Sequence, residues 1–386
     1  MSGVVLISTA EFALKSQPVR QLLIRLLKRH IRFNLKRIGL ENNKITQAGG
    51  FLIVSGFDDP EDAAKKLSHV FGVAHADACQ RIALDLGEIA ESAVRLAEQK
   101  LRPGDTFAIR ARNFEPSKIK GKEIEVRAGA EVLARLPSGL KVNLSNPDHT
   151  VRVFYGAKEA FVSSARFNGP GGLPVGSQGK LLGLATDPAY GPLSFYLLMK
   201  RGAMVWPVIP NFRPLLGENR PEEIIEGLRK LAPLVPRKGY SAHLMELDHD
   251  ASRMLDEADE SLQMALALRL AHRALAHLIQ TERALGLVTA DVFGRNGLES
   301  LKDLRIVEDI VKLPVYRPLL TLDEETMNRE LGERGLLQLA KSNAPRQVGR
   351  LGLSDVSARN LRDLEGRVQV GDLAKRIAGN STRIEI

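Results

Sequence analysis

The sequence predicts a two-part α/β protein, in which a module of mixed strands and helices precedes a doubly wound parallel sheet. A glycine- and proline-rich stretch, residues 169–180, leads directly into the apolar run 181–185, which is the pattern of a linker that enters a buried strand. Beyond this point apolar runs alternate with helical stretches, as in a parallel sheet with helical crossovers. Before it, short strands and amphipathic helices follow one another. A domain junction is therefore expected at residues 169–180.

The composition is that of an ordinary globular protein. The chain has 386 residues, enough for two or three domains, with 44% hydrophobic and 26% charged residues. A formal net charge of +9 favours a polyanionic partner, although a basic protein without such a partner has the same composition. No apolar run approaches the ~20 residues of a membrane span, and the N-terminus lacks a basic leader region. We therefore expect a cytoplasmic protein with no membrane contact.

The chain contains one cysteine, Cys79, so it forms no intrachain disulfide and no cysteine metal cluster. Its neighbours are mostly small, which favours a buried position or a strand edge. The alternative is a cysteine that carries a persulfide.

The first module begins with a strand at residues 4–9 and a helix at residues 18–38, where Pro18 suits the first helical turn. At 100° per residue, the apolar side chains of this helix share one face. Residues 17–40 contain no Asp or Glu, so the other face attracts phosphates through charge, or is simply solvated. This face, the basic ridge, consists of Arg25, Lys28, Arg29, Arg32 and Lys36.

The rest of the first module alternates between short strands and helices. Strand alternation in residues 106–112 directs Arg110 and Arg112 away from the apolar side of the strand, and a lysine-rich loop follows. The expected elements are strands at 51–54, 106–112, 140–144, 151–155 and 160–166 and helices at 60–70, 85–100 and 122–136.

The second module is expected to form the parallel sheet. Its strands are predicted at residues 181–185, 204–209, 243–247, 284–289 and 315–320. In such sheets ligands bind at the carboxyl ends of the strands, near the point where the strand order reverses. His243 and His249 stand among acidic residues; we interpret them as a solvated strand end, with metal ligation as the alternative. His272 and His277 do not share a helical face and are interpreted as structural.

Three motifs carry a resemblance to a known family. Residues 169–176 read Gly-Pro-Gly-Gly-Leu-Pro-Val-Gly, residues 199–202 read Met-Lys-Arg-Gly, and residues 140–148 read Leu-Lys-Val-Asn-Leu-Ser-Asn-Pro-Asp. The chain resembles the tRNA 4-thiouridine synthetases, sulfurtransferases that join a THUMP RNA-binding region to a PP-loop ATP pyrophosphatase domain of the adenine nucleotide α-hydrolase-like class. The resemblance implies a ferredoxin-like domain at 1–75, a THUMP domain at 76–168, a linker at 169–180, a degenerate PP-loop domain at 181–340 and a C-terminal extension at 341–386.

The resemblance also implies that the first module binds tRNA, at its acceptor arm and 3′ end. Relatives often have Arg at the position of Phe51, so one expected phosphate contact is missing. The residues expected to bind RNA are Lys15, Arg25, Lys28, Arg29, Arg32, Lys36, Arg110, Arg112, Lys118, Lys120, Lys122 and Arg166.

The phosphate loop departs from the family pattern, which reads Ser-Gly-Gly-x-Asp-Ser-Pro. Such a loop needs glycines so that several N–H groups face an anion at a helix N-terminus. Asp187 instead places a negative charge where pyrophosphate would lie, and Pro188 removes an N–H donor. The degenerate nucleotide loop consists of Thr186, Asp187, Pro188, Ala189, Tyr190 and Gly191.

A second family motif also departs from the pattern, because Arg295 replaces a Gln there. Thr289 and Gly294 remain and, with Arg295, form a residual ligand crevice. No cysteine stands at the family's sulfur-carrying position. We therefore expect a tRNA-binding pseudoenzyme with no catalytic residues and no cofactor; ATP and Mg²⁺ are expected only if the loop is active. The alternatives are a sulfurtransferase with an altered ATP site and an external sulfur donor, or an interaction subunit. The sequence leaves open a homodimer and the role of residues 341–386.

Overall fold

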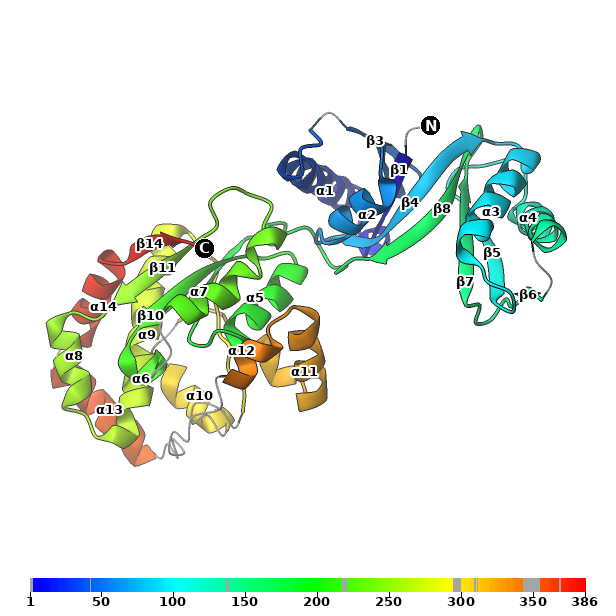
Figure 1. The fold of residues 1–386 in the computed structure, drawn as a ribbon. Helices are drawn as coiled ribbons and strands as arrows, with labels where there is room; N and C mark the ends of the chain where they lie inside the picture. Colours follow the sequence, from blue (N-terminus) through cyan, green and yellow to red (C-terminus); the bar gives the residue numbers. More distant parts are fainter. Residues whose placement is uncertain are drawn as a thin grey trace. The chain divides into compact units, whose positions relative to one another are not determined.

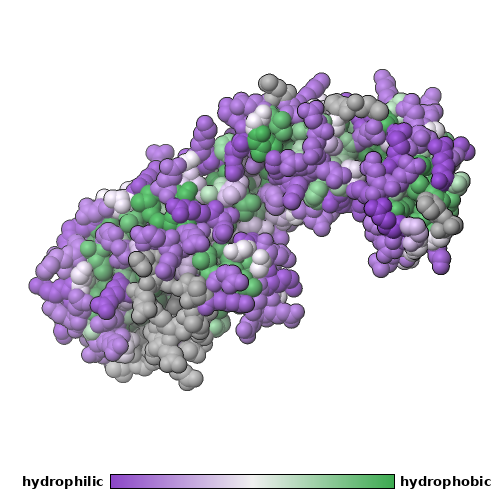
Figure 2. Space-filling model, viewed as in Figure 1, coloured by the Kyte–Doolittle hydropathy of each residue, from purple (hydrophilic) through white to green (hydrophobic). Residues whose placement is uncertain are grey.

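The chain divides into two compact units, Met1–Pro174 and Val175–Ile386 (Figure 1). The computed structural model describes residues 3–41, 43–136, 139–216, 221–293, 300–308, 310, 312–342, 355–367 and 369–386. The first unit has a mixed sheet and the second a largely parallel one, which confirms the predicted fold class. Within the described residues, no helix is long and apolar enough to cross a membrane. On the face drawn in Figure 2, hydrophilic residues predominate in both units.

The N-terminal unit is built on one eight-stranded sheet in the order β2-β3-β1-β4-β8-β7-β5-β6. The ferredoxin-like strands β2, β3 and β1 and the THUMP strands β7, β5 and β6 lie on either side of the central antiparallel pair β4–β8. The two halves therefore share one sheet. Its strands are β1 (Gly3–Thr9), β2 (Lys44–Ala48), β3 (Phe51–Phe57), β4 (Val73–Ala83), β5 (Thr106–Asn113), β6 (Lys141–Val142), β7 (His149–Tyr155) and β8 (Glu159–Asn168).

Four helices cover one face of this sheet. α1 and α2 bury their apolar sides against β1 and β3, and α3 and α4 bury theirs against β5 and β7. Asp59 and Asp85 cap α2 and α3, because each side chain accepts hydrogen bonds from backbone N–H groups of the first turn. The helices are α1 (Gln17–Arg37), α2 (Pro60–Ser68), α3 (Leu86–Lys100) and α4 (Gly121–Arg135).

Aromatic side chains on the other face join the two halves of the sheet. The ring of Phe51 on β3 lies 5.2 Å from that of Phe154 on β7, and Phe114 lies 5.8 Å from Phe161. The turn between β2 and β3 fits against this cluster only because Gly49 has no side chain: a Cβ there would lie 2.2 Å from the carbonyl oxygen of Phe114. The two halves are thus held together by packing as well as by strand pairing.

The C-terminal unit contains a six-stranded sheet in the order β13-β12-β9-β10-β11-β14. Its first five strands are parallel and β14 runs antiparallel to β11. The strand order reverses between β9 and β12, where the connections leave in opposite directions. The strands are β9 (Lys180–Leu184), β10 (Met204–Asn211), β11 (Ser241–Glu246), β12 (Leu287–Val288), β13 (Val315–Tyr316) and β14 (Thr382–Glu385).

Helices cover both faces of this sheet. α9 packs against Leu182 and Leu184, whereas α5 packs against the intervening Gly183, where a Cβ would lie 2.4 Å from the ring of Phe195. The helices of the unit are α5 (Tyr190–Lys200), α6 (Arg213–Leu216), α7 (Pro221–Arg229), α8 (His249–Asp256), α9 (Glu260–Glu282), α10 (Leu301–Glu308), α11 (Glu324–Glu333), α12 (Leu337–Ser342), α13 (Asp355–Arg367) and α14 (Val370–Gly379).

The C-terminal extension completes this unit. α13 and α14 pack on α9, and β14 extends the sheet beyond β11. Glu365 on α13 accepts hydrogen bonds from both Nε (2.8 Å) and Nη2 (2.7 Å) of the buried Arg269. Arg376 on α14 donates to Asp248 at 2.8 Å. Part of the extension, whose role the sequence left open, is therefore structural.

Candidate RNA-binding surface and nucleotide crevice

The basic ridge lies on the exposed side of α1, whose apolar side is buried against the sheet. Arg25, Arg29 and Arg32 are exposed and form no ion pair with any described residue. Lys28 donates to a glutamine of β2 at 3.2 Å, and Lys36 pairs at 3.1 Å with the glutamate that follows the helix. The ridge therefore offers three free guanidinium groups.

The other predicted RNA contacts in the N-terminal unit lie on several elements. Arg112 stacks on the ring of Phe51, with its guanidinium carbon 5.2 Å from the ring centroid. Arg110 donates to the carbonyl of Leu144. The side chains that are exposed on loops or at the start of a helix are Lys15, Lys118, Lys120 and Lys122.

Arg166 on β8 already has a partner. Its Nε and Nη2 donate to the two carboxylate oxygens of Asp77 at 2.8 and 3.1 Å, and Asp77 is fully buried. This bidentate pair neutralises a carboxylate at the centre of the sheet. Its part in RNA binding stays a prediction.

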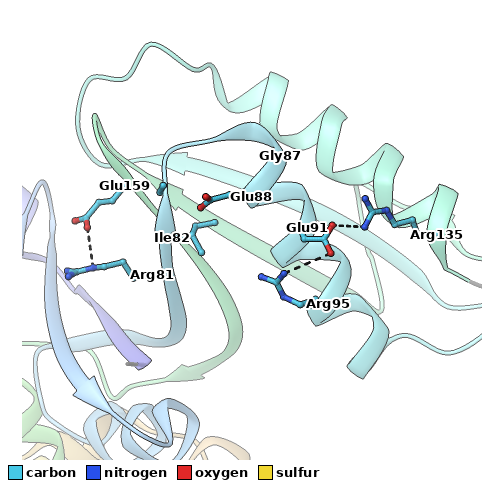
Figure 3. Close-up of a pocket in the computed structure, with 9 residues that line it drawn as sticks. Arg81, Ile82, Gly87, Glu88, Glu91, Arg95, Arg135 and Glu159 are labelled. Atoms are coloured by element: carbon cyan, nitrogen blue, oxygen red, sulfur yellow. Dashed lines mark hydrogen bonds and ion pairs between the residues drawn. The ribbon is translucent and has the colours of Figure 1, made fainter. Parts of the chain in front are cut away.

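The larger of two described grooves in this unit has balanced charges. It has a volume of about 870 Å³ and lies beside α3, α4 and the end of β4 (Figure 3). Arg81 pairs with Glu159 at 3.1 Å, and Glu91 pairs with Arg135 at 2.5 Å and with Arg95 at 4.0 Å. Because each of these arginines faces a carboxylate, the groove does not favour an anion.

The loop after β9 holds its own carboxylate at the start of α5. Oδ1 of Asp187 accepts hydrogen bonds from the backbone N–H groups of Ala189 (2.7 Å) and Tyr190 (2.8 Å). N–H groups at a helix N-terminus are the donors that a bound phosphate would use. Pro188, between Asp187 and Ala189, supplies no such donor. The donors of the loop are therefore directed at a side chain of the chain itself.

Apolar packing surrounds the same loop. Ala189 and Tyr190 belong to a buried cluster with residues of α11 and α12, including Leu331 and Ala340. On another side α7 lies so close that a Cβ on Gly227 would approach the carbonyl oxygen of Pro188 to 1.8 Å. Helices thus fill the space beside the loop.

At the carboxyl end of β12, where the sequence predicts a residual ligand crevice, the second motif contributes to a polar cluster. The hydroxyl of Thr289 donates to Oδ2 of Asp291 at 2.6 Å, and Nε of Arg317 donates to the same oxygen at 2.8 Å. Burial raises the pKa of Asp291, against the opposing effect of these hydrogen bonds. Ser194 on α5 donates to the carbonyl of Thr289 at 2.6 Å, which ties the polar cluster to the loop helix.

Sequence reasoning missed two residues of this polar cluster and named two that lie outside the described residues. Gly294 and Arg295 belong to the latter group. The missed residues are Asp291, which follows the predicted strand at 284–289, and Arg317, which lies within the predicted strand at 315–320 but follows the shorter β13, at the edge where ligands bind.

Among the described residues, no group of three or more His, Cys, Asp or Glu side chains is placed to hold a metal ion. The expectation that His243 is solvated is wrong: only 6% of it is exposed, because the C-terminal extension covers this side of β11, and its Nε2 lies 3.4 Å from Glu282. Cys79 is buried, as expected, and burial raises the pKa of its thiol well above the usual value.

The fold defines a class of protein in which a ferredoxin-like and THUMP unit precedes a PP-loop-type α/β domain. Family models match in the same order: the ThiI ferredoxin-like domain at residues 4–76, the THUMP domain at 83–165, and the thiamine biosynthesis protein ThiI at 176–335. The chain belongs to the tRNA 4-thiouridine synthetase, or tRNA sulfurtransferase, family, as predicted.

Relatives and solved structures agree with this family. The chain is 28% identical to the tRNA sulfurtransferase of Thermoplasma volcanium, covering 85% of this chain and 67% of the relative. It is 26% identical to a probable tRNA sulfurtransferase of Methanocaldococcus jannaschii, covering 86% and 87%. A structure described as a 4-thiouridine synthetase–RNA complex with bound ATP superimposes with a TM-score of 0.82 at 20% identity and full coverage of both chains. PH1313 of Pyrococcus horikoshii gives 0.67 at 24% identity, covering 87% and 100%.

Proposed function

We propose that this chain binds tRNA but does not activate uridine with ATP. The observation that carries the proposal is the hydrogen bonding of Asp187 to the N–H groups at the start of α5. A pyrophosphate placed there would compete with a covalently attached carboxylate and be repelled by its charge. The phosphate loop therefore does not fit ATP in the usual manner.

The RNA half of the proposal is supported by the basic ridge and by the names of the relatives. Free guanidinium groups on one helix face suit phosphate contacts, which give affinity without sequence preference. Relatives carry the name tRNA sulfurtransferase, and one solved structure of the same fold is described as an RNA complex. We propose the acceptor arm and 3′ end of tRNA as the ligand, with the domain boundaries predicted above.

The sulfur chemistry lacks an accessible nucleophile in this proposal. Cys79 is the single cysteine, and its thiol is buried and disfavoured as a thiolate. We propose that no cofactor is needed for RNA binding and that the protein acts in the cytoplasm.

A sulfurtransferase with an altered ATP site and an external sulfur donor is the second candidate. The observation in its favour is the cluster of Thr289, Asp291 and Arg317, a mostly buried polar group at the reversal of strand order. Asp291, whose pKa burial raises, is the sort of group that active sites use.

The two candidates differ in nucleotide binding. We expect unmodified tRNA to bind the purified protein with a steep salt dependence, and labelled ATP not to bind at millimolar concentration. Asp187→Gly removes the competing carboxylate and is expected to strengthen pyrophosphate binding. ATP binding by the wild-type protein, unchanged in Asp187→Gly, would contradict the proposal and favour the sulfurtransferase. Failure of the wild-type protein to bind either tRNA or ATP would favour an interaction subunit.

A further inference from the structure

The sheet of the N-terminal unit opens into a fork between β7 and β8. The two strands pair from Tyr155 and Ala160 to Arg152 and Ser163 (Figure 1). Beyond that pair β7 continues along β5, whereas β8 continues along β4 through a bulge. The backbone edges at residues 149–151 and 164–168 therefore belong to strands that have separated from each other.

A groove of about 530 Å³ occupies this fork. The C-terminal end of α3 closes one side, where Lys100 donates to the carbonyl of Ser164. The polar side chains that line the groove and matter here are Lys100, His149, Arg152, Ser163 and Arg166. Unlike the groove of Figure 3, where each arginine pairs with a carboxylate, this one contains a cation that forms no ion pair with a described carboxylate.

That cation is Arg152, at the point where the strands part. It is partly buried and forms no ion pair with any described residue. The nearby carboxylate of Asp77 is already held by Arg166 in a bidentate pair. Asp148, at the rim, is held by two hydrogen bonds from Thr106.

Physical chemistry makes this arrangement unfavourable without an anion. Burial and the neighbouring charge of Arg166 lower the pKa of Arg152, and they outweigh the opposing effect of the Asp77 carboxylate. A partly buried charge is normally compensated by a partner. Arginine holds phosphate by parallel hydrogen bonds from its planar guanidinium. Lys100 adds a second positive charge to the groove, although its Nζ also lies 3.7 Å from the exposed Glu61.

We propose that the fork between β7 and β8 is a phosphate seat in which Arg152, supported by Lys100, binds a phosphodiester of the RNA. This inference rests on the proposed tRNA binding and adds to it a residue that the sequence does not single out. The basic ridge then supplies exposed contacts on α1, and the seat supplies one contact inside the THUMP half of the sheet.

The test is a titration of the full chain with unmodified tRNA over a series of KCl concentrations, for wild type, Arg152→Gln, Arg152→Lys and Arg135→Gln. Arg152→Gln is expected to weaken binding about 5- to 10-fold. It should also make the negative slope of log K against log salt shallower by roughly 0.7–0.9, the effect of one phosphate contact. Arg152→Lys retains the charge and should retain the slope. Arg135→Gln removes one charge from the balanced groove and should leave the slope unchanged.

The outcomes separate this inference from the proposed function. If wild type does not bind tRNA, both fall. If wild type binds and Arg152→Gln matches it in affinity and slope, the seat alone is overturned. Equilibrium dialysis with inorganic phosphate is a further arm: tight binding of free phosphate that Arg152→Gln abolishes, without a change in tRNA affinity, would show a free-anion site and overturn the RNA assignment.

A second measurement needs no variant and so keeps the test valid if Arg152→Gln does not fold. Amide hydrogen exchange of the wild-type protein, with and without tRNA, reports on the fork directly. We expect RNA to slow exchange in residues 149–152 and 164–166. Unchanged exchange there, together with slowed exchange on α1, would overturn the seat.

Discussion

At the residue scale, each unit contains a buried polar side chain, and the two differ in whether hydrogen bonds compensate for the burial. Asp77 in the N-terminal unit is satisfied by Arg166, and the pair costs little because both carboxylate oxygens accept hydrogen bonds. His272 in the C-terminal unit is also buried, but neither ring nitrogen has a hydrogen-bond partner. Burial, with the charges of Arg317 and Arg269, lowers the pKa of His272 to about 3.

We predict that His272→Leu does not destabilise the protein at neutral pH. Between pH 6.5 and 3 the unfolded chain binds a proton at this histidine that the folded chain does not, so wild-type stability falls as the pH falls. The difference in free energy of unfolding between His272→Leu and wild type should therefore change by about 2 kcal/mol in favour of the variant when the pH falls from 7 to 5. Urea denaturation at both pH values measures this change. The exposed His249→Leu is the control, and a large loss of stability in His272→Leu at pH 7 would contradict the prediction.

At the scale of elements, β14 is held to the sheet by a carboxylate from α9. Glu282 at the end of α9 accepts hydrogen bonds from Lys180 on β9 and Arg383 on β14. Burial raises the pKa of Glu282, but these hydrogen bonds outweigh it and bring the pKa to about 2. The resulting stabilisation is present above the ordinary value of 4.5 and is lost as the pH falls towards 2.

Replacing this carboxylate should release the C-terminal strand. Glu282→Gln is expected to lower the free energy of unfolding by about 2 kcal/mol at pH 7, since hydrogen bonds to a charged acceptor are lost. It should also speed amide exchange in β14. Thermal melts and hydrogen exchange measure the two effects. Glu385→Gln, on an exposed position of β14, should change neither; equal effects of the two variants would refute the role of Glu282.

The basic ridge is the element-scale test of RNA binding. Replacing Arg25, Arg29 and Arg32 together by Gln should reduce tRNA affinity at least 10-fold. The negative slope of log K against log salt should become shallower by about two to three. Fluorescence anisotropy over a KCl series measures both quantities. A triple replacement of exposed cations in the C-terminal unit, Arg229, Lys230 and Lys238, should have a smaller effect, and the reverse order would argue against the ridge.

At the scale of the whole molecule, the hydrophobic clusters described above each lie within one unit. The ferredoxin-like and THUMP cores are contained in residues 1–174, and the core around α9 in residues 175–386. Each unit has enough buried apolar surface to form its own core. The two units are therefore expected to fold as separate cooperative bodies.

Calorimetry of the full chain should then show two unfolding transitions. Because a ligand stabilises the unit that binds it, tRNA should raise the temperature of one transition, that of the N-terminal unit, and ATP should raise neither. The fragment of residues 1–174 identifies the transition. A rise of the other transition with ATP would favour the sulfurtransferase alternative.

Much of the fold was predictable because its signals are local. The apolar faces of α1 and α3, the turn residues and the Gly-Pro-Gly-Gly motif all lie within short windows of sequence. β4 was missed as a strand because it mixes His, Asp and Arg with apolar residues. Its pairing partners, β1 and β8, lie far away in the sequence. The predicted strand at 315–320 is shorter than expected, because Pro318 begins a 3₁₀ turn there.

The candidate sites likewise combine features that local sequence predicts with features that depend on distant contacts. The sequence by itself determined the family, the order of the domains and the basic face of α1, because periodicity and motif spacing need no knowledge of distant contacts. That Asp187 and Pro188 replace the residues of a phosphate loop stays a prediction from the sequence. Only the tertiary structure decided that the carboxylate of Asp187 turns back onto the start of α5, and that Asp77 holds Arg166 from 89 positions away while Arg152 forms no ion pair with a described carboxylate. Pairing of this kind depends on which strands become neighbours, and that is settled by the packing of the whole sheet.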